Sequence, residues 1–459
     1  MFFPNLYKPA QAVRIDPSTG QVVAGTGFRY NGMGLPGNAF PAAAQGRIRN
    51  ADDPDVKRLF QGLPDTLSTT DMSLFQPRFG LAWDPFGKGK TSIRVGGGIF
   101  NSRFYFNDAT LLGGNPPLQA QAVVNSGSVD NPGGTSIAPI FPIPVTMHDP
   151  YIKHPVTYNY SVTLQHELPA KFLLELGYIG KLSRHLVSEI NINQLPVGTV
   201  QRNPGINVDA LRPYLGYSSI RHSGQRGSSN YNAMTTTVER RFTRGLSLQG
   251  AYTWSKSIDF GSSFRDIAMN SYDLSRERGL SDFDRAHIVM ISYIYELPFF
   301  KTSRMKALRT TLGGWQLSGF SSFQSGLPAS VTVPGDPAGV SGGAPQRPNV
   351  LGNAVLPRDQ RTETRYFDIA AFRTPAAGTF GSAGRNIIRQ PGTNNFDLSI
   401  TKYFPIRDQW RVQFRTEMFN VMNHLSFNRL EMQLGNRGFG SVTASDPARV
   451  IQFALRVEF

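Results

Sequence analysis

The last stretch of the chain alternates between apolar and polar side chains. It reads RVIQFALRVEF, and Ile451, Phe453, Leu455, Val457 and Phe459 occupy every second position. Residues two apart in a β-strand lie on the same face, so these side chains share one face and the residues between them share the other. The pattern predicts a two-faced strand. A half-buried strand of a soluble sheet has the same alternation, so the rest of the chain must identify its surroundings.

Similar alternation recurs along the chain and predicts eleven strands in all. Most of the segments have 10 to 14 residues, about twice the usual length of a globular strand but close to the ~9–11 residues of a tilted membrane-spanning strand. We therefore predict an all-β fold, an antiparallel transmembrane β-barrel. The predicted segments are residues 77–84, 90–103, 157–168, 171–182, 231–242, 245–258, 284–297, 314–326, 394–405, 409–421 and 449–459.

The connections between these segments alternate between short and long. Outer-membrane barrels have short periplasmic turns and long extracellular loops, whereas a soluble sandwich has no reason to place every long loop at one end. Counting back from a last strand that ends in the periplasm places all five short connections there. The predicted extracellular connections are 104–156, 183–230, 259–283, 327–393 and 422–448, which are rich in Gly, Pro, Asn and Ser.

The segment 409–421 shows the two faces most clearly. Its apolar positions are expected to face lipid, whereas Arg411, Arg415 and Glu417, with Arg456 of the last strand, are expected to face an aqueous lumen. A row of alternating charges opposite an apolar row does not fit a strand covered on both faces. The pattern favours a wide barrel whose interior is wet or plugged.

Aromatic residues gather at the ends of the segments that lead into short connections. Amphipathic rings of this kind form girdles at the headgroup level of outer-membrane barrels. The girdle residues expected on this pattern are Trp83, Phe86, Phe172, Phe242, Phe299, Phe300, Phe404, Trp410 and Phe459.

Composition supports this class and excludes others. The 459 residues include 46 Gly, 32 Pro and 11% aromatic residues, which is typical of many strands joined by turns. The absence of cysteine excludes a disulfide scaffold, a thiolate metal site and a Cys nucleophile. The net charge of +15 would suit nucleic acid, but the basic residues form no run, so we expect no nucleic-acid partner. No apolar stretch approaches the ~18 residues of a transmembrane helix.

No catalytic or cofactor motif stands out. GKGKTS at residues 87–92 ends like a phosphate-binding loop, but Asp84 occupies the place of its first glycine. His148 and His154, with Asp149 nearby, have poor metal-ligand spacing, and we expect them in a solvated loop. No Ser/His/Asp set or carboxylate pair is visible, so we expect neither an enzyme nor a bound cofactor. Six loop aromatics are expected to pack loops together rather than form a site: Phe104, Tyr105, Phe106, Tyr151, Tyr214 and Tyr217.

Several stretches resemble the C-terminal barrel of TonB-dependent outer-membrane transporters, especially their Oar-like group. The resemblance covers most of residues 75–459, and the stretches are fairly specific when taken together. They include SDFDRAHIVMISYIYELPFF (281–300), LGGWQLSGFSSFQSGLPASVTV (312–333), GRNIIRQPGTNNFDLSITKYFPI (384–406), RVQFRTEMFNVMNHLSFN (411–428) and the closing ALRVEF.

The resemblance implies energy-coupled uptake of a bulky ligand across the outer membrane of a Gram-negative cell. It also implies partners: lipid, the TonB complex, and the barrel assembly machinery, which reads a terminal amphipathic strand. Here the assembly signal would be Phe453, Leu455, Val457 and Phe459. The chain shows no plug, no TonB-contacting segment and no signal peptide, and about 11 of an expected 22 strands. A non-transporting adhesion or structural barrel of the outer membrane is the alternative, and an outer-membrane enzyme comes third.

The N-terminal part is expected to belong to a larger barrel. By strand parity, residues 77–459 are the C-terminal half of the barrel, and residues 1–76 are the tail of an extracellular loop or of a preceding barrel segment. Bacterial single-chain barrels use even strand numbers, and eleven is odd. We therefore expect that Met1 is not the natural beginning of the functional protein, which the DNA upstream of its codon would test.

Overall fold

The computed structural model describes residues 1–44, 46–48, 51–70, 74–103, 111–119, 130, 142–263, 265–407 and 410–459. Within these ranges, no helix combines the length and the apolar character needed to cross a membrane. Phe104, Tyr105 and Phe106 lie outside the described residues.

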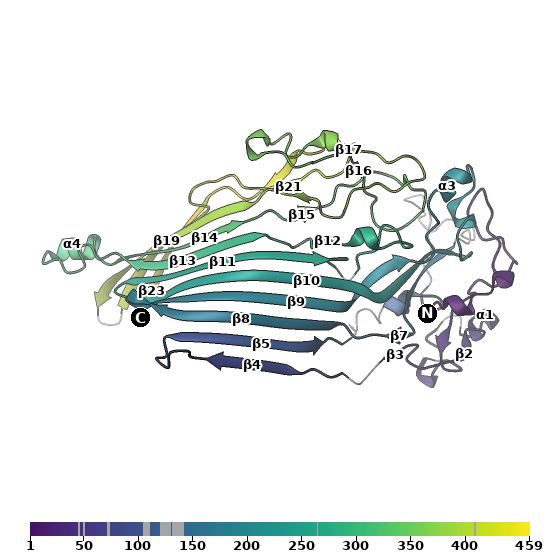
Figure 1. Ribbon diagram of the computed structural model, residues 1–459, viewed down its shortest axis with the longest axis horizontal. Coiled ribbons are helices and arrows are strands. Elements are labelled where there is room, and N and C mark those ends of the chain that lie inside the picture. Colours follow the sequence, from purple (N-terminus) through teal and green to yellow (C-terminus); the bar gives the residue numbers. More distant parts are fainter. Residues whose placement is uncertain are drawn as a thin grey trace.

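One long antiparallel sheet dominates the structure, and each of its eleven principal strands pairs with its neighbour along this path (Figure 1). All eleven predicted segments are confirmed as these strands. Each two-faced segment pairs with the next across a short turn or a folded loop, which keeps the contacts local. The strands are β4 (Arg78–Trp83), β5 (Thr91–Asn101), β8 (Val156–Leu168), β9 (Phe172–Asn191), β10 (Tyr217–Thr243), β11 (Leu246–Asp259), β13 (His287–Glu296), β14 (Trp315–Gln324), β19 (Thr393–Arg407), β20 (Trp410–Phe419) and β23 (Val450–Glu458).

Two of these strands are much longer than predicted. β9 continues to Asn191 and β10 begins at Tyr217, so both ends of the expected loop 183–230 belong to the sheet. This part lacks clear alternation, but Arg221 to Gly224 of β10 pair with β9 on one edge and Arg221 to Ser223 pair in parallel with β6 (Ile143–His148) on the other. Backbone pairing on both edges stabilises strands that side-chain periodicity does not announce.

The register divides the sheet into two faces. Arg411, Gln413 and Glu417 of β20 lie opposite Glu458, Arg456 and Gln452 of β23, whereas Val412, Phe414 and Met418 lie opposite Val457, Leu455 and Ile451. Directly paired residues of an antiparallel sheet point to the same face. We call the side of the sheet that carries Arg411 and Glu417 the polar face, and the side that carries Val412 and Phe414 the apolar face.

Aromatic rings cover glycines on the apolar face. Phe79, Tyr160 and Tyr293 pair directly with Gly97, Gly180 and Gly319. A Cβ placed on Gly180 would come within 2.1 Å of the Tyr160 ring, and Cβ atoms on Gly97 and Gly319 would come within 2.5 Å of the opposing rings. Each ring therefore occupies the space that a side chain on the neighbouring strand would need, which holds the two strands in register.

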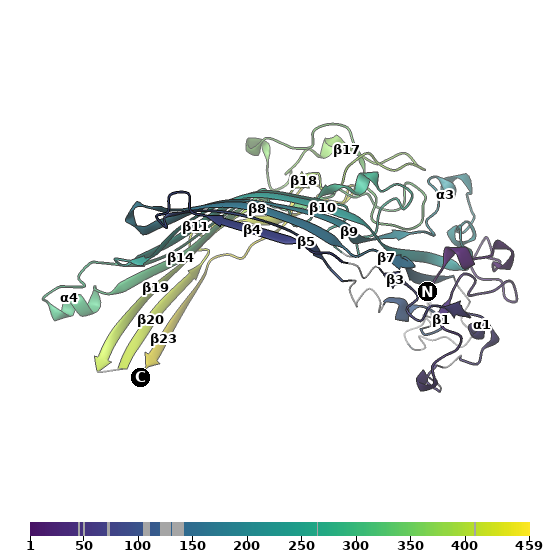
Figure 2. The same ribbon diagram turned by 60° about the horizontal axis from the view of Figure 1, so that its bottom comes forward.

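The sheet is curved, and its two edges remain open. β4 and β23 end the strand order, and within the described ranges no strand pairs with their outer edges. Figure 2 shows the sheet arching across its width, with β19, β20 and β23 turned down from the plane of β4 to β11. The strands therefore form a curved wall rather than a closed barrel.

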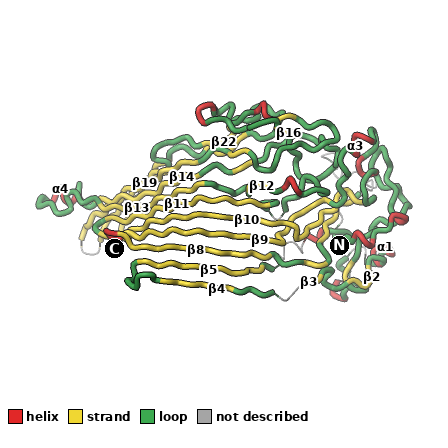
Figure 3. Tube along the Cα trace, viewed as in Figure 1, coloured by secondary structure: helices red, strands yellow, loops and turns green. Residues whose placement is uncertain are grey.

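All the short connections lie at one end of the sheet, together with the C-terminus (Figure 3). The turn after β4 is closed by Asp84, whose carboxylate accepts hydrogen bonds from the backbone N–H of Phe86, Gly87 and Gly89 at 3.1, 3.0 and 2.7 Å. Residues 84–89 therefore form a turn between β4 and β5. The connection after β13 is the longest of this group and contains α4 (Lys306–Thr311).

The long connections and the N-terminal residues gather at the opposite end (Figure 1). One apolar cluster packs Phe2, Met33 and Leu59 against Tyr217 and Ile220 of β10. A second cluster around Phe367 and Phe372 holds the connection between β14 and β19 together. The small elements here are α1 (Pro54–Lys57), α3 (Thr199–Arg202), β1 (Leu35–Pro36), β2 (Phe60–Leu63), β3 (Thr69–Thr70), β7 (Tyr151–Ile152), β12 (Gly279–Leu280), β15 (Pro328–Ala329), β16 (Asn349–Val350), β17 (Phe372–Arg373), β18 (Ile388–Arg389), β21 (Phe427–Leu430) and β22 (Val442–Ser445).

Short 3₁₀ helices lie in the N-terminal part and in the connections. They are Pro4–Leu6, Pro9–Gln11, Ala42–Ala44, Leu111–Gly114, Pro169–Lys171, Val208–Ala210, Ser275–Glu277, Arg358–Gln360 and Ile369–Ala371.

Candidate functional site

Charged and amide side chains form two groups of contacts on the polar face at the C-terminal strands. Arg411 Nε lies 2.5 Å from Glu458 Oε2, and Arg456 Nε lies 3.6 Å from the other oxygen of the same carboxylate. Arg415 Nε lies 3.3 Å from Glu417 Oε1, and Gln452 donates a hydrogen bond to Glu417. The four charged residues named from the sequence therefore share one face, Arg411 and Arg456 through Glu458 and Arg415 with Glu417. Whether that face lines an aqueous lumen stays a prediction.

Two polar rows cross this face from β10 to β20. Glu239, Gln249, Ser292, Phe320 and Asp397 are successive partners in one row. The next row joins Ser318, Ser399 and Glu417. Because each row is built by register between different strands, no short motif announces it.

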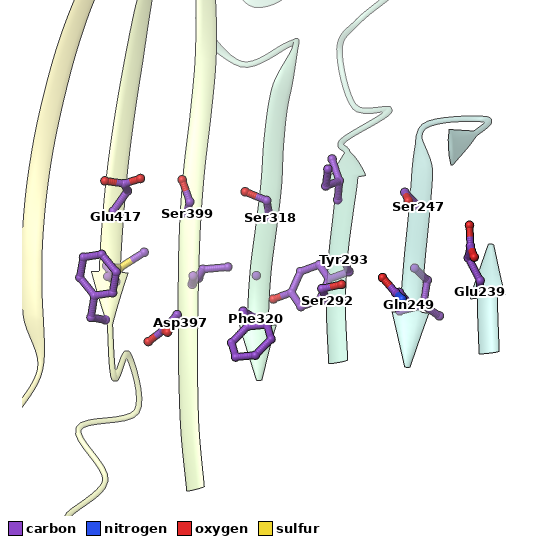
Figure 4. Close-up of a pocket in the computed structure, with 16 residues that line it drawn as sticks. Glu239, Ser247, Gln249, Ser292, Tyr293, Ser318, Phe320, Asp397, Ser399 and Glu417 are labelled. Carbon is purple, nitrogen blue, oxygen red and sulfur yellow. The ribbon is translucent and has the colours of Figure 1, made fainter. Parts of the chain in front are cut away.

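The two rows line a shallow pocket of about 390 Å³ (Figure 4). Its lining carries three acidic side chains, Glu239, Asp397 and Glu417, together with serine hydroxyls. Asp397 also accepts a hydrogen bond from the backbone N–H of Asn420 at 2.9 Å, which orients that carboxylate. Hydroxyl and carboxylate oxygens in this arrangement can hydrogen-bond a hydrated or polyhydroxylated solute.

Arginines from one long connection pair with acids from another. Arg347, in the connection between β14 and β19, places Nη1 and Nη2 each 3.2 Å from the two oxygens of Glu277, in the connection between β11 and β13. Arg385, from the first of these connections, pairs with Asp259 and lies 3.3 Å from Asp282. These ion pairs hold the two connections together, and the bidentate contact fixes the orientation of the guanidinium.

A cavity of about 570 Å³ lies beside these pairs. Arg265, Asp266, Glu277, Arg347 and Arg385 contribute charged groups to its lining. Arg347 and Glu277 are almost fully buried, so each depends on the other for its charge to be accommodated. No sequence pattern predicts this site, because its paired residues are separated by 70 to 126 positions.

The prediction that His148 lies in a solvated loop is wrong. His148 ends β6 and is 2% exposed, because β6 packs along β10. Asp149 Oδ1 lies 2.6 Å from His222 Nε2, and Arg226 Nη2 lies 2.7 Å from His222 Nδ1. Burial alone would raise the pKa of Asp149, but the hydrogen bond from His222 and the charges of His222 and Arg226 hold that pKa below its ordinary value.

The structure also places the other histidine and the loop aromatics that were considered from the sequence. The described residues contain no group of three or more His, Asp or Glu side chains that could hold a metal ion. His154 lies apart from His148 and contacts Thr70 and Ser102. Tyr217 is fully buried and donates a hydrogen bond to Asn31 O at 2.8 Å, and Tyr214 packs in the same cluster, which confirms their role in packing loops.

The residues predicted as an assembly signal lie on the open edge strand. Phe453, Leu455 and Val457 project from the apolar face of β23 and are strongly exposed. Phe459 is 86% exposed, and its ring stacks on Trp410 with centroids 5.2 Å apart. Their recognition by an assembly machinery stays a prediction.

Comparison with solved structures finds transporters of low sequence identity. The outer membrane transporter YddB from Escherichia coli is 11% identical, with a TM-score of 0.45 over 83% of this chain and 40% of that one. The FrpB iron transporter from Neisseria meningitidis is 12% identical, with a TM-score of 0.42 over 84% and 39%. The ferripyoverdine receptor of Pseudomonas aeruginosa is 10% identical, with a TM-score of 0.39 over 84% and 33%. The chain spans less than half the length of each.

Curated proteins include no match to this chain. The family described as the outer membrane beta barrel domain matches residues 3–452, which is nearly the whole sequence. The chain has long two-faced strands, short turns at one end of the sheet and folded loops at the other, and these are the features of outer-membrane barrels. The chain therefore belongs to the outer membrane beta barrel family, and its location is the outer membrane.

Proposed function

We propose that this chain is the C-terminal half of the barrel of a TonB-dependent receptor that takes up a bulky ligand. The polar face would line the lumen, and the apolar face would contact lipid. The observation that carries the proposal is the curved wall of eleven strands with two open edges, since open edges are not tolerated in lipid. A partner set of strands of similar size would close a barrel of about 22 strands, wide enough for a plug.

Such a ligand would meet two surfaces: the pocket on the polar face that Glu239, Asp397 and Glu417 line, which we call the polar pocket, and the cavity beside Arg347 and Arg385, which we call the loop cavity. The loop cavity combines Arg265, Arg347 and Arg385 with acidic groups at the end of the long connections, and the pocket continues the polar lining along the wall. The ion pairs of Arg347 and Arg385 would hold the loop cavity in one shape, so that ligand binding would lose little conformational entropy of the loops. TonB would act through segments that precede this one in the functional protein.

Uptake that depends on the proton gradient tests the transport proposal. In the source organism, deletion of the gene that carries this segment should abolish the uptake of one class among ferric siderophores, oligosaccharides, peptides and proteins. A protonophore should reduce uptake by the parent cells to the same level. Complementation with the intact gene is the control.

The alternative is an adhesion or structural barrel that transports nothing. It predicts that the deletion changes cell attachment or envelope integrity while every uptake rate stays at the parental level. Uptake that persists unchanged with protonophore present would also contradict the transport proposal.

A further inference from the structure

The connection between β13 and β14 is unusually basic. Residues 297–314, which we call the basic connection, include Lys301, Arg304, Lys306 and Arg309 and contain no Asp or Glu. Lys301 pairs with Glu296 at 2.8 Å. The other three cations are exposed, and no ion pair joins them to any part of the chain that the structure describes. This element therefore presents a net charge of about +3 that the described residues do not neutralise.

The same connection exposes large apolar side chains. Phe299, Met305 and Leu312 are 63%, 64% and 49% exposed. Exposed apolar side chains are unfavourable in open water. At a lipid surface they enter the headgroup boundary, and the neighbouring cations meet anionic headgroups.

Two side chains hold the basic connection against the apolar face of the sheet. Lys402 of β19 donates hydrogen bonds from Nζ to Thr311 O at 2.9 Å and Gly313 O at 2.6 Å, at the C-terminal end of α4. Trp315 donates from Nε1 to Thr311 O at 3.2 Å. Lys402 pairs with Trp315 and with Phe414, so it belongs to the apolar face.

The anchoring is specific rather than incidental. Lys402 is 1% exposed, and its ammonium lies 5.1 Å from the Trp315 ring and 5.0 Å from the Phe404 ring. The carbonyls at a helix C-terminus favour a cation, and the aromatic faces favour it further. A Cβ on Gly313 would come within 2.9 Å of Phe300 O, so the connection is folded tightly back on itself. The short-turn end of the lipid-facing wall thus carries a fixed, cationic and partly apolar projection (Figure 1).

We propose that the basic connection docks on anionic phospholipid headgroups of the leaflet at the short-turn end. Arg304, Lys306 and Arg309 contact the phosphates, and Met305 and Leu312 enter the boundary of the acyl chains. Juxtamembrane basic residues attract anionic lipid in this way, and the attraction falls as salt screens it. The proposal depends on the location in the outer membrane and not on transport.

Quenching of Trp315 by brominated lipids tests the proposal directly. The chain has four tryptophans, so replacement of Trp83, Trp254 and Trp410 by Phe leaves Trp315 as the reporter beside the connection. The full chain is folded into phosphatidylcholine vesicles that contain an equal fraction of either brominated phosphatidylglycerol or brominated phosphatidylcholine. We expect the association constant from quenching to be at least about threefold larger for phosphatidylglycerol, and the difference to shrink in 0.5 M salt.

Two charge variants distinguish this site from general attraction to the basic protein. The triple variant Arg304→Gln, Lys306→Gln and Arg309→Gln should lose the preference, while its quenching by brominated phosphatidylcholine stays the same and shows that it is still in the bilayer. A matched triple variant in the long connections should keep the preference: Arg358→Gln, Arg373→Gln and Arg437→Gln. These three arginines are exposed at the opposite end of the sheet.

Equal quenching by the two lipids in the parent chain would overturn the proposal. So would a preference that survives the first triple variant or that is insensitive to salt. If the first triple variant fails to fold, the single variant Lys306→Gln still decides: it should weaken the preference, whereas the single variant Arg358→Gln should not.

Discussion

Neighbouring residues of β20 meet opposite surroundings. Phe414 lies on the apolar face beside Leu455, and Arg415 lies on the polar face beside Ala454. Phe414→Arg would bring a charge into lipid, which costs about 2–4 kcal/mol near the midplane of the bilayer. Arg415→Leu should leave membrane assembly nearly intact. Urea unfolding in vesicles and the shift in mobility on heating measure both variants.

Leu455→Arg on β23 is a second test of the same face. Equal tolerance of Phe414→Arg and Arg415→Leu would show that the faces are assigned the wrong way round.

The ring of Tyr160 makes Gly180 intolerant of any side chain. Gly180→Ala would place a Cβ 2.1 Å from the ring, and such overpacking costs about 1–3 kcal/mol. Gly250→Ala is the matched control, because Gly250 lies in β11 and a Cβ at that position would meet no other atom within 4 Å. We expect urea unfolding to show a loss of stability only for the first variant.

A double-mutant cycle locates the cause. Tyr160→Ala added to Gly180→Ala should recover part of the loss, because the ring is no longer displaced. Additive losses would mean that the glycine is needed for backbone conformation and not for the ring.

Asp149 makes the packing of β6 against β10 sensitive to pH. Its pKa is lowered by His222 and Arg226, so the folded state favours the carboxylate. The stabilisation is fully present above the ordinary Asp pKa of about 4, and it is lost as pH falls through the lowered value. Hydrogen exchange at residues 143–148 and 217–226, corrected for intrinsic rates, should therefore accelerate below about pH 4.

Asp149→Asn is the control for this titration. It should accelerate exchange at neutral pH by a loss of about 1–2 kcal/mol and remove the acid-dependent change. A parent chain whose exchange in this region has no such acid step would contradict the assignment.

At the scale of elements, the C-terminal strand combines a structural and an assembly role. Phe459 stacks on Trp410 but is otherwise exposed, so its deletion removes little packing. We expect the deletion to slow insertion into the outer membrane more than it lowers the stability of the finished protein. Pulse-chase assembly in cells and urea unfolding of the purified protein separate the two effects. Normal assembly kinetics would remove the signal assigned to this strand.

The strands differ in how well periodicity announces them. β20 and β23 alternate strictly, because one side of each is apolar and the other is charged, so their bounds were predicted almost to the residue. The added lengths of β9 and β10 are polar and rich in Ser and Gly, and backbone pairing with each other and with β6 determines them. Such pairing depends on partners distant in sequence, which no local pattern reports.

For the whole molecule, the open edges have a fixed geometry. Ten antiparallel pairings separate β4 from β23, so the two edge strands run in the same direction. Two copies whose apolar faces lie on the same side can therefore pair antiparallel only edge to like edge, about a two-fold axis. We expect the isolated chain in detergent to associate in this way, because unpaired edges are templates for another strand.

Disulfide trapping measures this association, since the chain has no native cysteine. Single cysteines at Ile451, Phe453 and Leu455 of β23 should give cross-linked dimers at one or more positions. A cysteine at Tyr252, in the interior strand β11, is the control. Cross-linking no stronger along β23 than at Tyr252 would show that the edges do not pair.

By itself the sequence determined the fold class, the eleven strands, the end at which the turns lie and the division of the strands into two faces. These features follow from period-two alternation and chain direction, which are local. Only the tertiary structure decided which rings cover Gly97, Gly180 and Gly319 and that His148 is buried. It also decided that Arg347 and Arg385, in one long connection, pair with Glu277 in another and with Asp259 at the end of β11. Those contacts depend on register and on loop folding, which bring together side chains 18 to 126 positions apart, and no short-range pattern encodes them.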